Sequence, residues 1–208
     1  MKTSFYMVGY KRNQVEAAIS RVVGSSASRA PSGLRHRLKR LLDTDRTLVR
    51  NSGLAYAFGG APGSGVEVRF SAYEAFALLV ALYLLEHGFP QQKAVLAVRT
   101  IRHALEPEHK RMLKLDPQVL FNQDDLQRSP GQLVISSTDP VYLVIRTEEK
   151  RAAKPVKDIR ICHGEPELMQ FIKAALASYT ILELTSAAHL LDSHLAKTEP
   201  SHRGRAAT

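Results

Sequence analysis

The sequence predicts an α+β fold made of two parts, and three observations lead to it. In the first 105 residues, apolar side chains repeat every three or four positions in several segments, as on amphipathic helices. A segment rich in glycine and proline interrupts these helices, and an alternating apolar segment follows it. Later, short β-branched segments precede two more helical patterns. We therefore predict a helical domain with a β-hairpin over residues 1–105, a linker over 106–130, a small α/β domain over 131–197 and a disordered tail over 198–208.

Two helices are predicted before the hairpin. Asn13 can cap the first, whose apolar positions continue to Val23, and Gly24 ends it. The second follows a connector of small residues, and its apolar positions are Leu34, Leu38, Leu41 and Leu42. Between these leucines lie five residues that carry or can acquire a positive charge: Arg35, His36, Arg37, Lys39 and Arg40. The second helix therefore has an apolar stripe and a basic opposite face.

The predicted hairpin consists of two strands and a flexible tip. Leu48–Phe58 has a strand-like pattern, Gly59–Gly65 forms the tip, and Val66–Phe70 alternates as a second strand. We interpret the hairpin as the wing of a winged helix. The glycines of the tip also resemble a phosphate-binding loop. That motif requires a lysine after its last glycine and then a helix, whereas this loop is followed by Val66-Glu67 and a strand.

Two helices complete the N-terminal domain. Ser71-Ala72-Tyr73-Glu74 is a capping box that opens an apolar, buried helix over about Ala72–His87, and Gly88 ends it. The next helix runs from Pro90 to about Leu105. Its spacing directs four side chains inward, Val95, Val98, Ile101 and Leu105, and three outward, Lys93, Arg99 and Arg102.

The C-terminal domain is predicted to combine three strands with two helices. The strands are Gln132–Ser136, Val141–Thr147 and Asp158–Cys162, and a charged loop separates the last two. The helices are about Glu165–Ala177 and Thr180–Lys197.

The positive charge of the chain is concentrated at one end. The net charge is +9, and residues 1–70 hold 12 Lys and Arg against 4 Asp and Glu. This concentration favours contact with a polyanion, most often nucleic acid. A single cysteine, with neither a signal peptide nor an apolar stretch long enough to span a bilayer, predicts a cytoplasmic, nucleoid-associated protein with no membrane partner.

The order of helix, basic helix, hairpin, capped helix and helix resembles the DNA-binding domain of the MerR family over about residues 12–105. Gly33–Leu42, GLRHRLKRLL, is similar to the family's second helix, and Arg69–Phe89 is similar to the junction of its wing and third helix. The tip and the connector are longer than in the family, and the family's dimerisation helix has no counterpart here. The resemblance implies a winged helix-turn-helix whose second helix lies in the major groove.

These observations predict a sequence-specific protein that binds double-stranded DNA and regulates transcription. Arg35 and Arg37 would reach base edges, Lys39 and Arg40 would reach phosphates beside His36, and Arg69 would contact the backbone or a minor groove. Half-site recognition predicts a homodimer, formed by a C-terminal domain that can also bind a regulatory partner. The alternative is a protein-interaction adaptor that uses the basic face to bind an acidic protein.

Catalytic and metal chemistry are weaker interpretations. Cys162-His163 suggests an activated thiol, but no partner follows from spacing, and a cysteine in a strand is usually buried. His189 and His194 are five residues apart and do not share a helical face as metal ligands would. We predict no enzyme activity, no cofactor and no metal.

Overall fold

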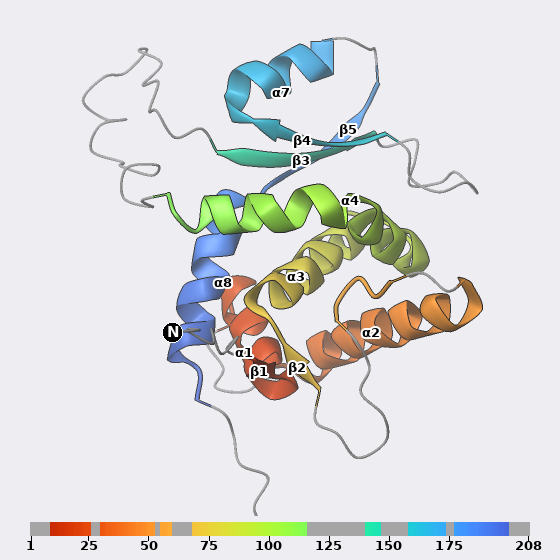
Figure 1. The fold of residues 1–208 in the computed structure, drawn as a ribbon, viewed down its shortest axis with the longest axis vertical. Helices are drawn as coiled ribbons and strands as arrows, with labels where there is room; N and C mark the ends of the chain where they lie inside the picture. Colours follow the sequence, from red (N-terminus) through yellow and green to blue (C-terminus); the bar gives the residue numbers. More distant parts are fainter. Residues whose placement is uncertain are drawn as a thin grey trace, which may run out of the picture.

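The computed structural model describes residues 9–25, 30–52, 55–59, 68–115, 140–146, 158–173 and 177–199. These residues form six helices and two small antiparallel sheets, so the fold is α+β. In Figure 1 the three-stranded sheet lies at one end of the molecule and the N-terminal helices lie at the other.

The N-terminal part begins with a short strand and a helix. β1 (Tyr10–Lys11) leads directly into α1 (Arg12–Val22), and the predicted stop residue Gly24 follows the helix with a positive φ of 88°. β1 pairs antiparallel with β2 (Arg69–Phe70), so that Tyr10 faces Phe70 and Lys11 faces Arg69. The partner of β2 is therefore a segment that precedes both helices.

The prediction that Leu48–Phe58 forms the hairpin partner of β2 is wrong. Residues 48–52 belong to α2 (Ser32–Ser52), which is longer than predicted. The physical reason is that Leu48, seven residues after Leu41, packs on the same core and continues the helical period. The tip residues 60–65 and the strand residues 66 and 67 lie outside the described residues. Within the described ranges, no wing hairpin is present.

α3 and α4 form the centre of the molecule. α3 (Ala72–Glu86) begins with the predicted capping box, in which Ser71 Oγ accepts a hydrogen bond from Glu74 N at 3.1 Å and Ser71 N donates to Glu74 Oε2 at 2.8 Å. α4 (Gln91–Met112) continues past its predicted end at Leu105. Pro107 lacks only one backbone hydrogen bond, and buried His109 and Met112 extend the apolar stripe, so the first seven residues of the predicted linker are helical.

The C-terminal part is a three-stranded sheet with the order β4-β3-β5. Its strands are β3 (Val141–Arg146), β4 (Ile159–His163) and β5 (Tyr179–Glu183). α7 (Gly164–Lys173) lies on one face of the sheet and α4 lies on the other (Figure 1). The predicted strand Gln132–Ser136 lies outside the described residues.

The predicted start of the last helix, at Thr180, is too early. Residues 179–183 form β5, and α8 (Thr185–Lys197) begins only after it. Thr180 and Leu182 are buried while Ile181 between them is exposed, which is the two-residue period of a strand. Pairing with β3 therefore overrides the helical pattern.

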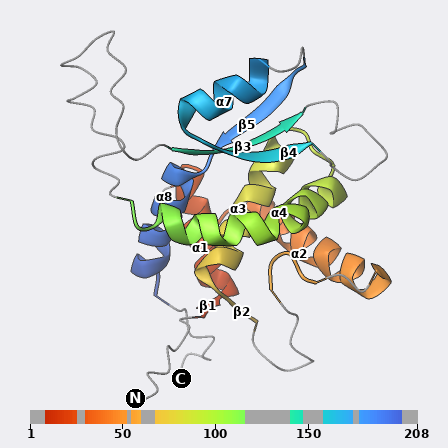
Figure 2. The same ribbon diagram turned by 45° about the horizontal axis from the view of Figure 1, so that its top comes forward.

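One hydrophobic core joins the two ends of the chain. A single cluster contains residues from Val15 in α1 to Leu195 in α8, together with sheet residues such as Leu143. α8 packs along α1, as both ribbon views show (Figures 1 and 2). The division into domains at residues 105 and 131 stays a prediction, and the shared core argues against independent folding. Among the helices of the described ranges, none is long and apolar enough to cross a membrane.

Candidate nucleic-acid interface

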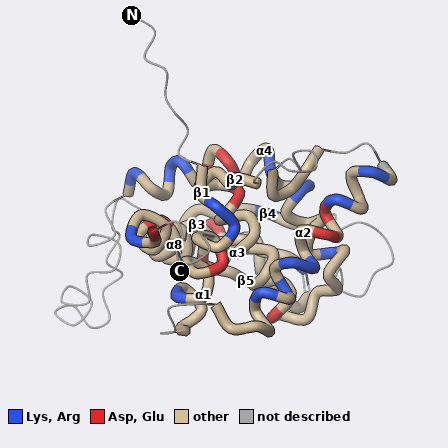
Figure 3. Tube along the Cα trace, turned by 90° about the horizontal axis from the view of Figure 1, so that it is seen from below, with Lys and Arg blue, Asp and Glu red and all other residues tan. Residues whose placement is uncertain are grey.

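α2 has one buried face and one exposed face. Leu34, Leu38 and Leu41 are buried against the core, and Leu42 and Asp45 complete this face. The opposite face is formed by exposed side chains that follow the helical period: His36, Lys39, Arg40, Asp43, Thr47 and Arg50. Figure 3 shows Lys and Arg along α2, interrupted by acidic positions. We call these six residues the exposed face of α2.

The basic residues predicted from the sequence occupy different positions around α2. His36, Lys39 and Arg40 lie on the exposed face. Arg37 lies to one side, where its Nη1 is 3.3 Å from Glu86 Oε1 at the end of α3. Arg35 is only partly exposed, and its Nε is buried without a hydrogen-bond partner among the described atoms. Arg35 and Arg37 are thus turned away from the centre of the exposed face.

Arg69 lies on β2 and is fixed by contacts near the start of the described chain. Its Nη1 donates a hydrogen bond to the Gly9 carbonyl at 3.1 Å. A Cβ atom at Gly9 would lie 2.9 Å from Arg69 Cβ, so glycine permits this close approach. Lys11 faces Arg69 directly across the two strands. Two cationic side chains therefore lie beside each other on the two-stranded sheet.

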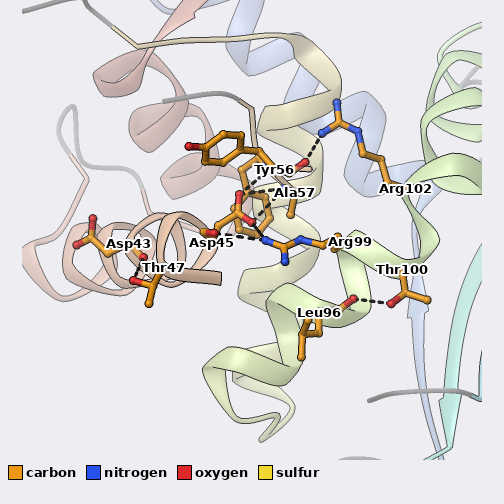
Figure 4. Close-up of polar contacts among 10 residues, drawn as sticks. Asp43, Asp45, Thr47, Tyr56, Ala57, Leu96, Arg99, Thr100 and Arg102 are labelled. Carbon is orange, nitrogen blue, oxygen red and sulfur yellow. Dashed lines mark hydrogen bonds and ion pairs between the residues drawn. The ribbon is translucent and has the colours of Figure 1, made fainter. Parts of the chain in front are cut away.

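A buried polar network holds α2 against α4. The Asp45 carboxylate, which is 2% exposed, accepts hydrogen bonds from the backbone N–H groups of Ala57 and Phe58 at 2.9 to 3.1 Å. Arg99 of α4 reaches the same carboxylate with Nη2 to Oδ1 at 2.5 Å (Figure 4). The Arg99 side chain is 9% exposed, so the prediction that it faces outward is wrong.

The next arginine of α4 holds the same loop. Arg102 Nη1 donates to the Tyr56 carbonyl at 2.5 Å, and its guanidinium lies 5.4 Å from the centre of the Tyr73 ring (Figure 4). Residues 55–59 are therefore tied to α4 by Arg102 and to α2 by Asp45. Gly59 in this loop has a φ of 97°, and a Cβ there would lie 2.7 Å from the Glu74 carboxylate. The network fixes the position of α2 on the core.

A groove of about 500 Å³ borders the exposed face between α2 and the start of α4. Gln91 of α4 spans it by donating to the Arg40 carbonyl at 2.8 Å and to Thr44 Oγ1. Five of its eight lining residues carry a hydroxyl or amide group, and the full set is Arg40, Asp43, Thr44, Thr47, Leu48, Asn51, Gln91 and Gln92. Such groups can donate to and accept from base edges and phosphates.

The Cys162-His163 pair lacks the surroundings of an activated thiol. Cys162 is fully buried beneath α7, and burial, together with the nearby Glu167 carboxylate, raises the pKa of its thiol. His163 lies between two carboxylates, with Nε2 3.3 Å from Glu108 and Nδ1 3.2 Å from Glu167. Within the described ranges, no group of three or more His, Cys, Asp or Glu residues is arranged to hold a metal ion.

Comparison with known protein families and with curated protein sequences finds no match for this chain. The candidate site is therefore defined by the structure alone. The structure adds Lys11, Thr47 and Arg50 to the residues predicted from the sequence. Thr47 and Arg50 continue the helical period of His36 and Lys39, so the sequence did contain a signal for their place on the exposed face. The interpretation of Leu48–Phe58 as a strand prevented this signal from being recognised. The pairing of Lys11 with Arg69 depends on a contact between distant segments, which spacing does not reveal.

Proposed function

We propose that this protein binds double-stranded DNA through the exposed face of α2 and regulates transcription. The observation that carries the proposal is the combination of His36, Lys39 and Arg40 on the solvent side of a helix whose other side is buried. An α-helix fits the major groove of B-DNA, where arginine can form two hydrogen bonds to guanine. The resemblance of Gly33–Leu42 to the second helix of MerR-like domains supports the same orientation.

The contacts divide into two kinds in this proposal. Arg40 and Thr47, which line the groove, would read base edges, with Gln92 of α4 beside them. Lys39 and Arg50 lie on the same face and supply phosphate contacts, which bring affinity and salt dependence. The opposed cations Lys11 and Arg69 supply a further phosphate contact from the two-stranded sheet.

The proposal is tested by fluorescence anisotropy of a labelled random-sequence duplex titrated with the full chain. The double variant Lys39→Ala/Arg40→Ala should weaken binding by about tenfold or more, since each contact contributes on the order of 1 kcal/mol or more. The matched control is Arg160→Ala/Lys173→Ala, which removes two exposed charges near the three-stranded sheet and should change affinity less than twofold. Equal losses in both variants would contradict a role for α2.

The second candidate function is an adaptor that binds an acidic protein through the same face. Asp43 at the centre of the exposed face favours it, because a carboxylate there repels phosphates. Asp43→Asn separates the two functions. On the DNA-binding account this substitution should strengthen duplex binding. Wild-type and Asp43→Asn chains that both fail to bind duplex DNA at low salt would leave the adaptor as the better account.

A further inference from the structure

The outer edge of β5 differs from the other edge of the three-stranded sheet. In the order β4-β3-β5, both β4 and β5 are edge strands. At the β4 edge, the outward-pointing backbone N–H of His163 already donates to Glu167 Oε2 of α7 at 2.7 Å. On the outer side of β5, no residue of the described ranges forms a strand pair.

The register shows which backbone groups of β5 point outward. Leu184 N donates to Val141 O at 2.8 Å, so this pair is hydrogen-bonded across the two strands. Hydrogen-bonded pairs alternate along an antiparallel ladder, and Leu182 and Thr180 therefore also direct their N–H and C=O groups toward β3. The N–H and C=O groups of Tyr179, Ile181 and Glu183 point away from the sheet.

The side chains of β5 do not protect this edge. Natural edge strands are guarded by lysine, proline, bulges or inward-pointing charges. β5 contains one charged residue, Glu183, and its carboxylate accepts hydrogen bonds from Thr185 N at 2.5 Å and Ser186 N at 3.0 Å. Glu183 thus caps α8 and is turned away from the edge. Ile181, at the centre of the strand, is 39% exposed.

We propose that β5 is the homodimer interface, where it pairs antiparallel with β5 of a second copy of this chain. Because the outward residues are spaced evenly about Ile181, a two-fold axis at Ile181 places Ile181 opposite Ile181 of the second copy. The same axis places Tyr179 opposite Glu183, so no like charges meet. All three outward positions then form hydrogen-bonded pairs, and the two sheets become one continuous six-stranded sheet. The strand is thus complementary to its own copy, with no like charges opposed, which favours a second copy of this chain as the occupant.

The interface is tested first by a directed disulfide in the full chain. Hydrogen-bonded antiparallel partners have Cα atoms about 5.5 Å apart, which lies within the range that a disulfide spans. Ile181→Cys should therefore form a covalent dimer under mild oxidation. Val23→Cys is the matched control, since Val23 is 37% exposed but lies at the end of α1 and should stay monomeric on a non-reducing gel. The native Cys162 is buried and gives no background.

Sedimentation equilibrium of the uncrosslinked protein completes the test. The wild type should be a dimer, and Ile181→Lys should raise its dissociation constant by about tenfold or more, because two lysines would face each other. Ile181→Pro should have the same effect by removing an outward N–H that the β3 ladder does not use. A monomeric wild type, or a dimer that Ile181→Cys does not link, would overturn the proposal. DNA is absent from these measurements, so their result and that of the α2 test are independent.

Discussion

His109 is a histidine buried among aromatic rings in the centre of the molecule. Its ring stacks on Phe76 with centroids 4.7 Å apart and meets Tyr73 edge-on at 6.0 Å. Burial, with smaller contributions from Lys110 and His189, lowers the pKa of His109 to about 4. The folded protein therefore holds this imidazole neutral at a pH where an exposed histidine would be protonated.

This depressed pKa predicts a loss of stability in mild acid. Between pH 6.5, the ordinary value of histidine, and about pH 4, the unfolded chain binds a proton that the folded protein does not. The neutral His109 ring therefore costs no stability above pH 6.5, and the free energy of unfolding decreases as the pH falls below that value. At pH 5 the free energy of unfolding should be lower by about 2 kcal/mol than at pH 7.5 because of this group.

Urea unfolding at the two pH values measures the effect. His109→Phe retains the stacking on Phe76 and should show a pH-dependent loss about 2 kcal/mol smaller than the wild type. His103→Phe is the control, because His103 lies on the same helix and is exposed. A His109→Phe protein that loses as much stability as the wild type between pH 7.5 and pH 5 would show that another group is responsible.

At the scale of elements, the contact between α2 and α4 depends on the buried Asp45–Arg99 pair. Removal of one partner leaves the other charge buried without compensation, which costs about 3–5 kcal/mol. Asp45→Ala should therefore lower the free energy of unfolding by that amount, as measured by urea denaturation. Arg46→Ala, which removes an exposed ion pair with Asp43, should cost less than about 1 kcal/mol.

A double-mutant cycle distinguishes the ion pair from simple loss of packing. Asp45→Ala combined with Arg99→Met should be less destabilised than the sum of the two single variants, because neither charge is then left alone. Additive losses would mean that the two side chains contribute separately.

Elements were predictable from the sequence where a local signal defined them. The capping box at Ser71 and Gly24 after α1 mark helix ends through chemistry within a few residues. The end of α2, the start of β5 and the burial of Arg99 were missed for a different reason. Each depends on a partner distant in the sequence: the core beneath Leu48, the ladder with β3 and the Asp45 carboxylate. The basic character of α2 was predictable, whereas the direction of each side chain required its true length.

At the scale of the whole molecule, α8 completes the core formed by α1, α3 and α4. Leu191 of α8 is 1% exposed and belongs to the same cluster as Val15 of α1. Leu191→Ala should destabilise the protein by about 2–5 kcal/mol, as for other large-to-small changes in a core. Because the core is shared, the loss should extend to the N-terminal helices.

Hydrogen exchange of the full chain measures how far this loss extends. Amides of α1 and α3 should exchange faster in Leu191→Ala to the same degree as those of α8. An exchange increase confined to α8 and the three-stranded sheet would instead support two domains that fold separately. The exposed Leu190→Ala is the neighbouring control and should change exchange little.

The proposed function of the protein depends on DNA contact through the exposed face of α2. The most direct measurement is the salt dependence of duplex binding for the wild type, Lys39→Ala/Arg40→Ala and Arg160→Ala/Lys173→Ala. Each phosphate contact contributes about 0.9 to the slope of log affinity against log salt concentration. Because Lys39 is the phosphate contact that the α2 double variant removes, this variant should reduce the slope by about 1 relative to the wild type, and the control should leave it unchanged. An unchanged slope and affinity in the α2 variant would contradict the account.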